Sequence, residues 1–261
     1  MLQDKFKKLI QITLAPLSFI IIWSFIAPIY HLPSIVGIGA AIIEMIRNGT
    51  YVHDILISSY RSLLGFFIGY TLGAFLGVLT GRYLHIFLVL GGLLLFLRWT
   101  PVLAILPLTI RIGGLGEGPK IFLIAWACLF LSWIYTHVSV SKLDRTYIWW
   151  SDSLGLNLGQ RLFKIYIPAI SPSLIGAARA ALAISLIVVV AAELGGTLQS
   201  GFFRDGLGYR ISRAIETNRN DINIACILTF GMLGIIFDFL LIKFIKIISY
   251  FTRIDFYRTE A

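Results

Sequence analysis

The sequence predicts an all-α polytopic membrane protein with about six transmembrane helices. The 261-residue chain is 58% hydrophobic and 13% charged, which is about half the charged share of ordinary soluble domains. Its apolar residues gather in runs of about twenty or more, the length that a helix needs to cross a bilayer. We expect one transmembrane domain over residues 1–261, with spans at about 9–29, 60–81, 84–110, 120–141, 172–196 and 222–248.

The first apolar run, residues 9–29, follows Lys5, Lys7 and Lys8, as the apolar part of a signal peptide would. Its length, and the lack of a clear small-residue cleavage site, favour a retained signal anchor. Residues 31–59 then mix apolar and charged positions. A Pro-Ser pair followed by an amphipathic run predicts a surface helix in this part of the chain.

The second span lies between Arg61 and Arg82 and carries a periodic series of glycines. A glycine recurs at every fourth position: Gly65, Gly69, Gly73, Gly77 and Gly81. This spacing places small residues along one stripe of a helix, where a second backbone can approach closely. We interpret the stripe as a packing surface inside the bundle and not as a ligand contact.

The third span, residues 84–110, is interrupted by Arg98, Pro101 and Pro107. Charged residues and prolines at membrane depth are found where a helix borders a cavity or pathway, because lipid does not satisfy their polar groups. The sequence therefore predicts that this helix lines a pathway.

The later spans also carry charged residues. Arg179 and Glu193 lie in the fifth span and Asp238 lies in the sixth. With Arg98, Pro101 and Pro107, we place Arg179 and Glu193 along the pathway. Two readings of Arg98 stay open: it attracts an anion, or it pairs with an acid such as Glu193 or Asp238.

Residues 144–168, between the fourth and fifth spans, have a helical periodicity of their own. Ser141 with Asp144 predicts a capping box at the start of a short helix that ends near Ser153. Gly155 then supplies a turn, since glycine adopts a left-handed conformation without steric cost.

A second short helix is expected after this turn. Asn157 is a good N-cap, and Pro168 is expected to end the helix before a Ser-Pro pair starts the fifth span. Two short helices hinged at a glycine, between membrane spans, form a compact unit that another protein can bind.

The residues of this unit resemble a known signature. Gly155, nine further residues, and then Ile165-x-Ile167-Pro168 resemble the Gly-to-Pro half of the "EAA" motif of permease subunits of ABC importers. Two further segments, 98–108 and 114–120, also resemble segments of that family. The resemblance covers the chain from about 32 to 253 and is greatest to the nitrate, sulfonate, taurine and bicarbonate branch.

The E-A-A half of the motif departs from the family, because Trp149, Trp150 and Ser151 stand in its place. Asp152 is an imperfect substitute for the missing acid, since it lies about 300° around a helix from Trp149. Three explanations stay open: a reshaped, more apolar groove on the ATPase, a second permease with a fuller motif, or tryptophans anchored at the membrane interface. By resemblance, the ATPase-coupling residues are Trp149, Trp150, Ser151, Asp152, Gly155, Ile165, Ile167 and Pro168.

The resemblance implies a bundle of about six spans that dimerises around a central pathway for a small anion such as nitrate, sulfonate, taurine or bicarbonate. A homodimer is favoured over a heterodimer. Two cytoplasmic ABC ATPase subunits would bind the coupling helices at 144–168 and would hold ATP and Mg, with no cofactor on this chain. A periplasmic or lipid-anchored binding protein would deliver the substrate.

The basic character of the chain, a formal net charge of +9, fits loops rich in Lys and Arg on the cytoplasmic side and not nucleic-acid binding. Their distribution predicts that both termini are cytoplasmic, and the resemblance implies a multi-pass protein of a bacterial-type plasma (inner) membrane. Cys128 and Cys226 lie in apolar runs without metal-ligand neighbours, which predicts two buried thiols.

The sequence has no phosphate-binding loop of the Walker type, so we expect a transport subunit without an ATPase motif and not an enzyme. The four histidines are scattered, and no metal site is expected. Two alternative classes remain. An ion-coupled secondary transporter would use charged residues in broken spans as relay sites, and a structural membrane subunit would need none.

Overall fold

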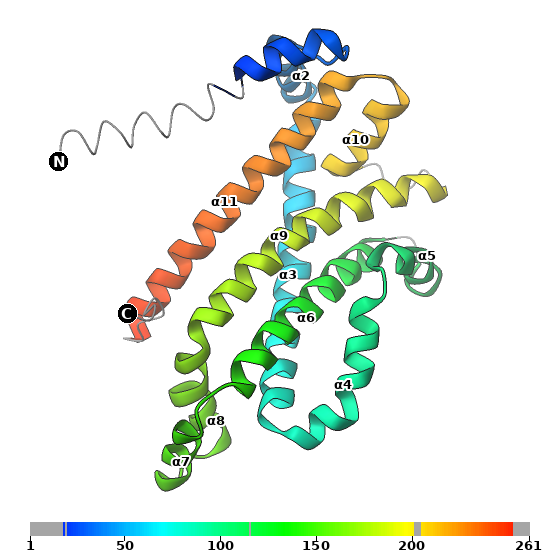
Figure 1. The fold of residues 1–261 in the computed structure, drawn as a ribbon. Coiled ribbons are helices and arrows are strands. Elements are labelled where there is room, and N and C mark those ends of the chain that lie inside the picture. Colours follow the sequence, from blue (N-terminus) through cyan, green and yellow to red (C-terminus); the bar gives the residue numbers. More distant parts are fainter. Residues whose placement is uncertain (1–17, 19, 115, 201–204, 253–261) are drawn as a thin grey trace, which may run out of the picture.

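The computed structural model describes residues 18, 20–114, 116–200 and 205–252, and every regular element over these residues is a helix (Figure 1). A short apolar helix, Ile20–Ile29, comes first. The elements that follow are α2 (Ile35–Arg47), α3 (Thr50–Arg82), α4 (Leu84–Trp99), α5 (Val102–Gly113), α6 (Glu117–Ser141), α7 (Arg145–Ser153), α8 (Leu158–Arg161), a π-helical turn (Leu162–Tyr166), α9 (Ile167–Ser200), α10 (Leu207–Glu216) and α11 (Asn220–Thr252).

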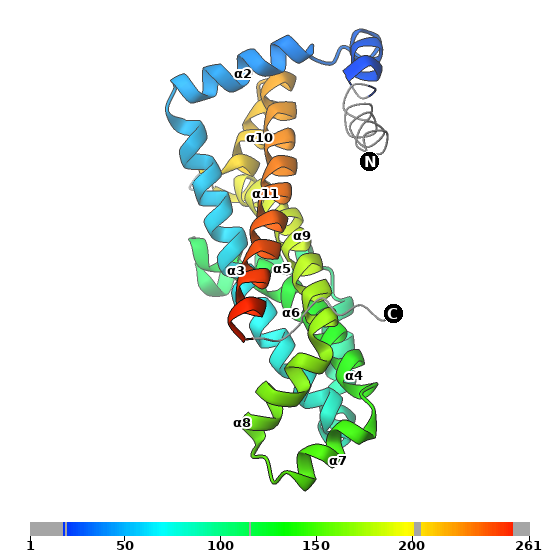
Figure 2. The ribbon, with the colours of Figure 1, turned by 90° about the vertical axis from the view of Figure 1, so that its left-hand side faces the viewer.

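The long helices run between two ends of the molecule. In both views α2 and α10 lie at one end, and α7 and α8 lie at the other (Figures 1 and 2). α3 and α11 lead away from the α2 end, whereas α9 returns toward it (Figure 1). The long helices therefore run back and forth between the two ends of the molecule, as expected for an all-α polytopic membrane protein.

Four of the described helices are long and apolar enough to cross a membrane: Thr50–Arg82, Glu117–Ser141, Gly159–Gly195 and Asn220–Ile247. α4 and α5 meet at an angle of 98° and count as a fifth span if they are taken together. The expected third span is therefore not one straight helix, because Pro101 stands at the N-cap of α5. Of the expected first span, 9–29, residues 9–17 and 19 fall outside the described residues, and the remainder contains the short helix Ile20–Ile29.

Local sequence features determine where α2 and α3 begin. The Ser34 side chain caps α2 by accepting a hydrogen bond from the Gly37 N–H at 3.1 Å. Gly49 adopts a left-handed φ of 73° between the two helices. α3 then starts at Thr50, earlier than the span expected at 60–81, and its first turns pack against α10.

The glycine stripe of α3 is a packing surface, as predicted. α3 packs more extensively on α6 than on any other described element. A Cβ atom added to Gly69 would lie 2.2 Å from the Ala125 carbonyl oxygen, and one added to Gly73 would lie 2.2 Å from that of Leu129. The two backbones are therefore in direct contact, and a side chain at either position has no room.

α6 supplies the centre of the core. Leu123, Ile124, Cys128 and Trp133 are completely buried. The indole N–H of Trp133 donates a hydrogen bond to the Thr80 hydroxyl at 3.0 Å, which satisfies its polar group inside the bundle. Both cysteines of the chain are buried and free, as expected.

Pro168 does not end a helix, contrary to the expectation. α8 continues through the π-helical turn Leu162–Tyr166 directly into α9, whose second residue is Pro168. A wider π turn before the proline accommodates its ring and its missing N–H. Ser171 does not start a new helix but donates its hydroxyl to the Pro168 carbonyl at 2.8 Å.

Candidate functional site

α7, α8 and the link between them form a knob at the end of the molecule opposite α2 and α10 (Figures 1 and 2). Asp144 caps α7: its Oδ1 accepts hydrogen bonds from the backbone N–H of Thr146 at 2.9 Å and from the Thr146 hydroxyl at 2.8 Å. These bonds hold the pKa of the Asp144 carboxyl below its usual value, so the cap is lost only as the pH falls through that lowered pKa. Ser141 belongs to α6, so its expected role in a capping box is wrong.

The turn of the knob has the predicted geometry. Gly155 adopts a left-handed φ of 60°. Asn157 and Gln160 then form a reciprocal capping box, with Gln160 N–H to Asn157 Oδ1 at 2.9 Å and Asn157 N–H to Gln160 Oε1 at 3.1 Å. The Arg161 guanidinium donates to the Leu156 carbonyl at 2.7 Å. The knob is therefore fixed by its own hydrogen bonds.

The knob presents apolar side chains outward. Trp149 is 64% exposed, Trp150 is 63% exposed and Leu154 is 69% exposed. The ring of Tyr147 lies edge-on to that of Trp150, with centroids 6.4 Å apart. Exposed apolar groups gathered in this way form a contact surface for another protein or for the membrane interface. Ser151 lies on α7 beside Asp152, and both side chains fall outside the described part of the structure.

The remaining motif residues lie where the knob joins the body. Ile165, Ile167 and Pro168 are half-buried around the π-helical turn. Tyr166 is buried among them, and its hydroxyl accepts a hydrogen bond from the Arg82 guanidinium at 2.9 Å. Because Arg82 is the last residue of α3, this bond fastens the base of the knob to that helix.

Arg98 lies at the α4–α5 bend. Its side chain is exposed, and its guanidinium carbon lies 5.5 Å from the centre of the Trp99 ring. It contributes to the lining of a cavity of about 200 Å³. Among the described residues, Glu193 pairs with Arg61 and Asp238 pairs with Arg179, so of the two readings left open for Arg98, the pairing with one of these acids is not observed.

Arg179 on α9 and Asp238 on α11 form a bidentate ion pair. The Nε–Oδ1 distance is 2.7 Å and the Nη2–Oδ2 distance is 2.9 Å. The Arg179 side chain is 52% exposed and that of Asp238 is 37% exposed. Both line a hollow of about 580 Å³.

Glu193 belongs to a buried polar cluster and not to an open pathway. Its carboxylate accepts hydrogen bonds from Arg61 Nη1 at 2.6 Å, from the Ser58 hydroxyl at 2.9 Å and from the Gly208 N–H at 2.8 Å. Arg61 also forms a two-bond pair with Glu117 at the start of α6, in which Nη2 donates to Oε1 at 2.7 Å. The Arg61–Glu193 pair is almost completely inaccessible to solvent, so we assign it an anchoring role.

The same cluster binds the N-terminus of α10 through hydrogen bonds. The N–H of Gly206 donates to Asp54 Oδ1 and that of Leu207 donates to the Ser58 hydroxyl, both at 2.9 Å. Helix N-terminal N–H groups have no partner in their own helix, and here acids of α3 and α9 supply one. A Cβ atom added to Gly206 would lie 2.5 Å from Glu193 Oε1, which explains the glycine at this position.

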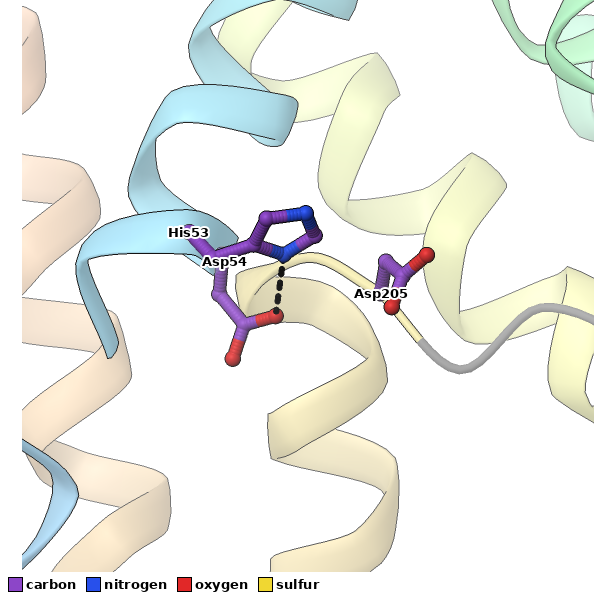
Figure 3. A group of neighbouring side chains, drawn as sticks. All are labelled: His53, Asp54 and Asp205. Carbon is purple, nitrogen blue, oxygen red and sulfur yellow. Dashed lines mark ion pairs between the residues drawn. The ribbon is translucent and has the colours of Figure 1, made fainter. Parts of the chain in front are cut away.

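His53, Asp54 and Asp205 bring their ligand atoms within 4.8 Å of one another (Figure 3). This grouping has the donor types of a cation site, with His53 Nδ1 4.0 Å from Asp54 Oδ1 (Figure 3). Both Asp54 oxygens are already used, Oδ1 by the Gly206 N–H and Oδ2 by the Arg210 guanidinium. Arg210 supplies the positive charge that Asp54 requires, so the cluster serves as an anchor for α10.

Comparison with known proteins agrees with this architecture. The family described as "binding-protein-dependent transport system inner membrane component" matches residues 69–249. A putative ABC transporter permease of Methanocaldococcus jannaschii is 31% identical over 89% of this chain and 88% of its own length. The putative aliphatic sulfonates transport permease SsuC of Bacillus subtilis is 31% identical over 86% of this chain and 81% of its own length.

Two further proteins are similar to this chain at lower sequence identity. The nitrate import permease NrtB of Synechocystis is 27% identical over 71% of this chain and 65% of its own length. A chain of the MetNI methionine ABC transporter, solved in inward-facing conformations, shares the fold with a TM-score of 0.58 at 17% identity, over 77% of this chain and 94% of that one.

These findings define an all-α, multi-pass membrane component of a transporter. The chain belongs to the family of binding-protein-dependent transport system inner membrane components, the permease subunits of ABC importers. Membership sets aside the alternatives of an ion-coupled secondary transporter and a purely structural subunit.

Proposed function

We propose that this chain forms the translocation pathway of an ABC importer for a small anion of the sulfonate or nitrate type. The observation that carries the proposal is the knob: two short helices hinged at Gly155, with apolar side chains turned outward, at one end of the bundle. The names of the sulfonate and nitrate permeases among its relatives support the substrate class. Arg98 and Arg179 supply exposed positive charge for an anion.

The proposed energy source is a pair of separate ABC ATPase chains, each docked on one knob and each holding ATP and Mg. Trp149 and Trp150 form the centre of the docking surface in place of the small residues of the family motif. ATP-driven closure of the ATPases would move the knobs and switch the pathway between its two facing states.

The proposed assembly contains two permease chains, with a homodimer favoured, and a binding protein that delivers substrate at the α2 and α10 end. The knob end then faces the cytoplasm of a bacterial-type cell. We propose that both termini lie in the cytoplasm as well, and the distribution of Lys and Arg supports this orientation.

Gly155→Val is expected to abolish uptake of ethanesulfonate while the protein still inserts into the membrane. A β-branched residue at a positive φ is strained by about 1–3 kcal/mol, so the knob changes shape at the ATPase groove. Uptake in cells and copurification of the ATPase measure the effect.

Gly155→Asn is the matched control, because asparagine tolerates the left-handed conformation and the space around Gly155 is open. It should retain uptake. Normal uptake by the valine variant would remove the hinge from the proposal, and uptake abolished by an uncoupler at constant ATP would contradict the ATP-driven mechanism.

Trp150→Ala is expected to weaken ATPase binding about tenfold or more, because a buried aromatic anchor at an interface contributes about 2 kcal/mol. Copurification yield and stimulated ATP hydrolysis measure it. Trp99→Ala is the control, since Trp99 is 77% exposed at the α4–α5 bend, away from the knob. Wild-type ATPase yield and stimulation in the Trp150 variant would assign both knob tryptophans to the lipid boundary.

A further inference from the structure

The Arg179–Asp238 pair lies deep inside two apolar helices. Arg179 is near the middle of the apolar span Gly159–Gly195, and Asp238 lies within the span Asn220–Ile247. At 1.5 Å per residue, Arg179 lies about 24 Å from Gly195 and about 30 Å from Gly159, so a hydrocarbon layer about 30 Å thick that is centred on this helix contains it. A charged pair at that depth belongs in a bundle interior or against water, and not against lipid.

The exposure of this pair separates it from the Arg61–Glu193 pair. The Arg61–Glu193 pair is closed off, with side-chain exposures of 1% and 0%. The Arg179–Asp238 pair has exposures of 52% and 37%. One side of the pair therefore faces a space outside this chain.

That space is bordered by small residues without a packing partner. Exposed positions on α9 follow a stripe that includes Gly176, Arg179 and Ala183. A Cβ atom added to Gly176 or to Gly231 on α11 would meet no atom within 4 Å, whereas every glycine of the α3 stripe contacts α6. The hollow of about 580 Å³ beside the ion pair has Gly176 and Ala183 of α9 and Gly234 of α11 in its lining, together with the larger apolar residues Leu182, Leu186 and Ile187.

We propose that Arg179 is the anion contact of the pathway and that Asp238 is its competing internal counterion. This inference rests on the proposed function and adds the residues that set its selectivity. The guanidinium fork binds two oxygens of one planar or tetrahedral anion, so a sulfonate or nitrate can replace the Asp238 carboxylate on the same donors.

The counterion has a consequence for release. A permeating ion must bind well enough to enter and weakly enough to leave. Asp238 returns to the fork as the anion departs, so the guanidinium is never left without a negative partner in a space of low polarity. The pair therefore makes the contact selective for anions and keeps it reversible.

The test measures the local potential directly and does not depend on transport. Ala183→Cys, one helical turn from Arg179, is made in the intact complex in nanodiscs of zwitterionic lipid. Anionic and cationic methanethiosulfonate reagents of similar size (sulfonatoethyl and trimethylammonioethyl) are compared by their rates of modification. The native thiols, Cys128 and Cys226, are completely buried and give the background.

We expect modification by both reagents above this background. Relative to the otherwise wild-type chain, Arg179→Gln should lower the anionic-to-cationic rate ratio about tenfold, and Asp238→Asn should raise it by a similar factor, as one unit charge at close range does in a partly hydrated space. The neutral pair, Arg179→Gln with Asp238→Asn, should lie between the two. If Arg179→Gln does not fold, the Asp238→Asn variant alone decides the outcome.

Three results would overturn the inference: no modification above background, a rate ratio that neither substitution changes, or a disulfide between two copies at Ala183→Cys without reagent access, which identifies a dry interface. Failure of the proposed function is recognised separately. If the importer transports neither sulfonate nor nitrate but shows the expected anionic-to-cationic rate ratios, the proposed substrate class is wrong. The inference about the Arg179–Asp238 pair then still holds.

Discussion

Replacing Gly69 with leucine is expected to separate α3 from α6 and to prevent the chain from reaching its folded state. The first atom of any side chain at this position would lie 2.2 Å from the Ala125 carbonyl oxygen and 2.7 Å from the Cys128 Cβ. Backbone atoms cannot rotate away, so the helices must move apart along the main contact of the core. Overpacking of this kind destabilises by about 3 kcal/mol or more.

The yield of monodisperse protein after detergent extraction and the midpoint of thermal unfolding measure this effect. Gly92→Leu is the matched control, because Gly92 lies inside the helix α4 and has nothing within 4 Å of an added Cβ. The control makes the same exchange of glycine for a better helix former and should unfold at the wild-type temperature. Equal midpoints for both variants would show that the α3–α6 contact does not limit stability.

Arg61→Met is expected to release α10 and to destabilise the α2 and α10 end of the bundle by about 3–5 kcal/mol, because it leaves the buried Glu193 carboxylate without its cation. The readouts are the thermal midpoint and the rate of proteolysis of the segment before α10. A wild-type midpoint with unchanged proteolysis would refute the anchoring role.

Two further variants isolate the ion pair. Arg61→Met combined with Glu193→Met replaces both charges and should recover part of the lost stability, since an apolar pair of similar volume avoids the unpaired charge. Arg213→Met removes a partner from the exposed Arg213–Glu216 pair, whose side chains are 57% and 53% exposed. Such a surface pair contributes at most about 1 kcal/mol, so this control should unfold near the wild-type temperature.

Local features were predictable from the sequence because their causes are local. The glycine stripe follows from a spacing of four, the turn at Gly155 from its lack of a Cβ atom, and the cap at Asn157 from its short polar side chain. The same local reasoning was wrong at Pro168, because a π-helical turn relieves the clash that normally ends a helix.

Pairings across the fold were not predictable in the same way. In the sequence Arg61 only marks the start of the second span, and the acids that it binds, Glu117 and Glu193, lie 56 and 132 residues away. Only the packing of α3, α6 and α9 brings these groups together. A usable signal did exist, since Gly206 and Gly208 mark a close approach of backbone to some other group, but the sequence does not identify that group as Glu193.

The two fastenings between α9 and α3 make these helices a lever. Glu193 of α9 is joined to α3 near the α2 and α10 end through Arg61, and Tyr166, the residue just before α9, is joined to α3 near the knob through Arg82. A tilt of about 10° at the knob would displace Arg179 by about 3 Å and Glu193 by about 7 Å, from the helical rise of 1.5 Å per residue. In the proposed assembly, a small angular movement of a docked ATPase would therefore be amplified along α9. Stiffness, and not flexibility, is then the mechanical property that the long helix contributes.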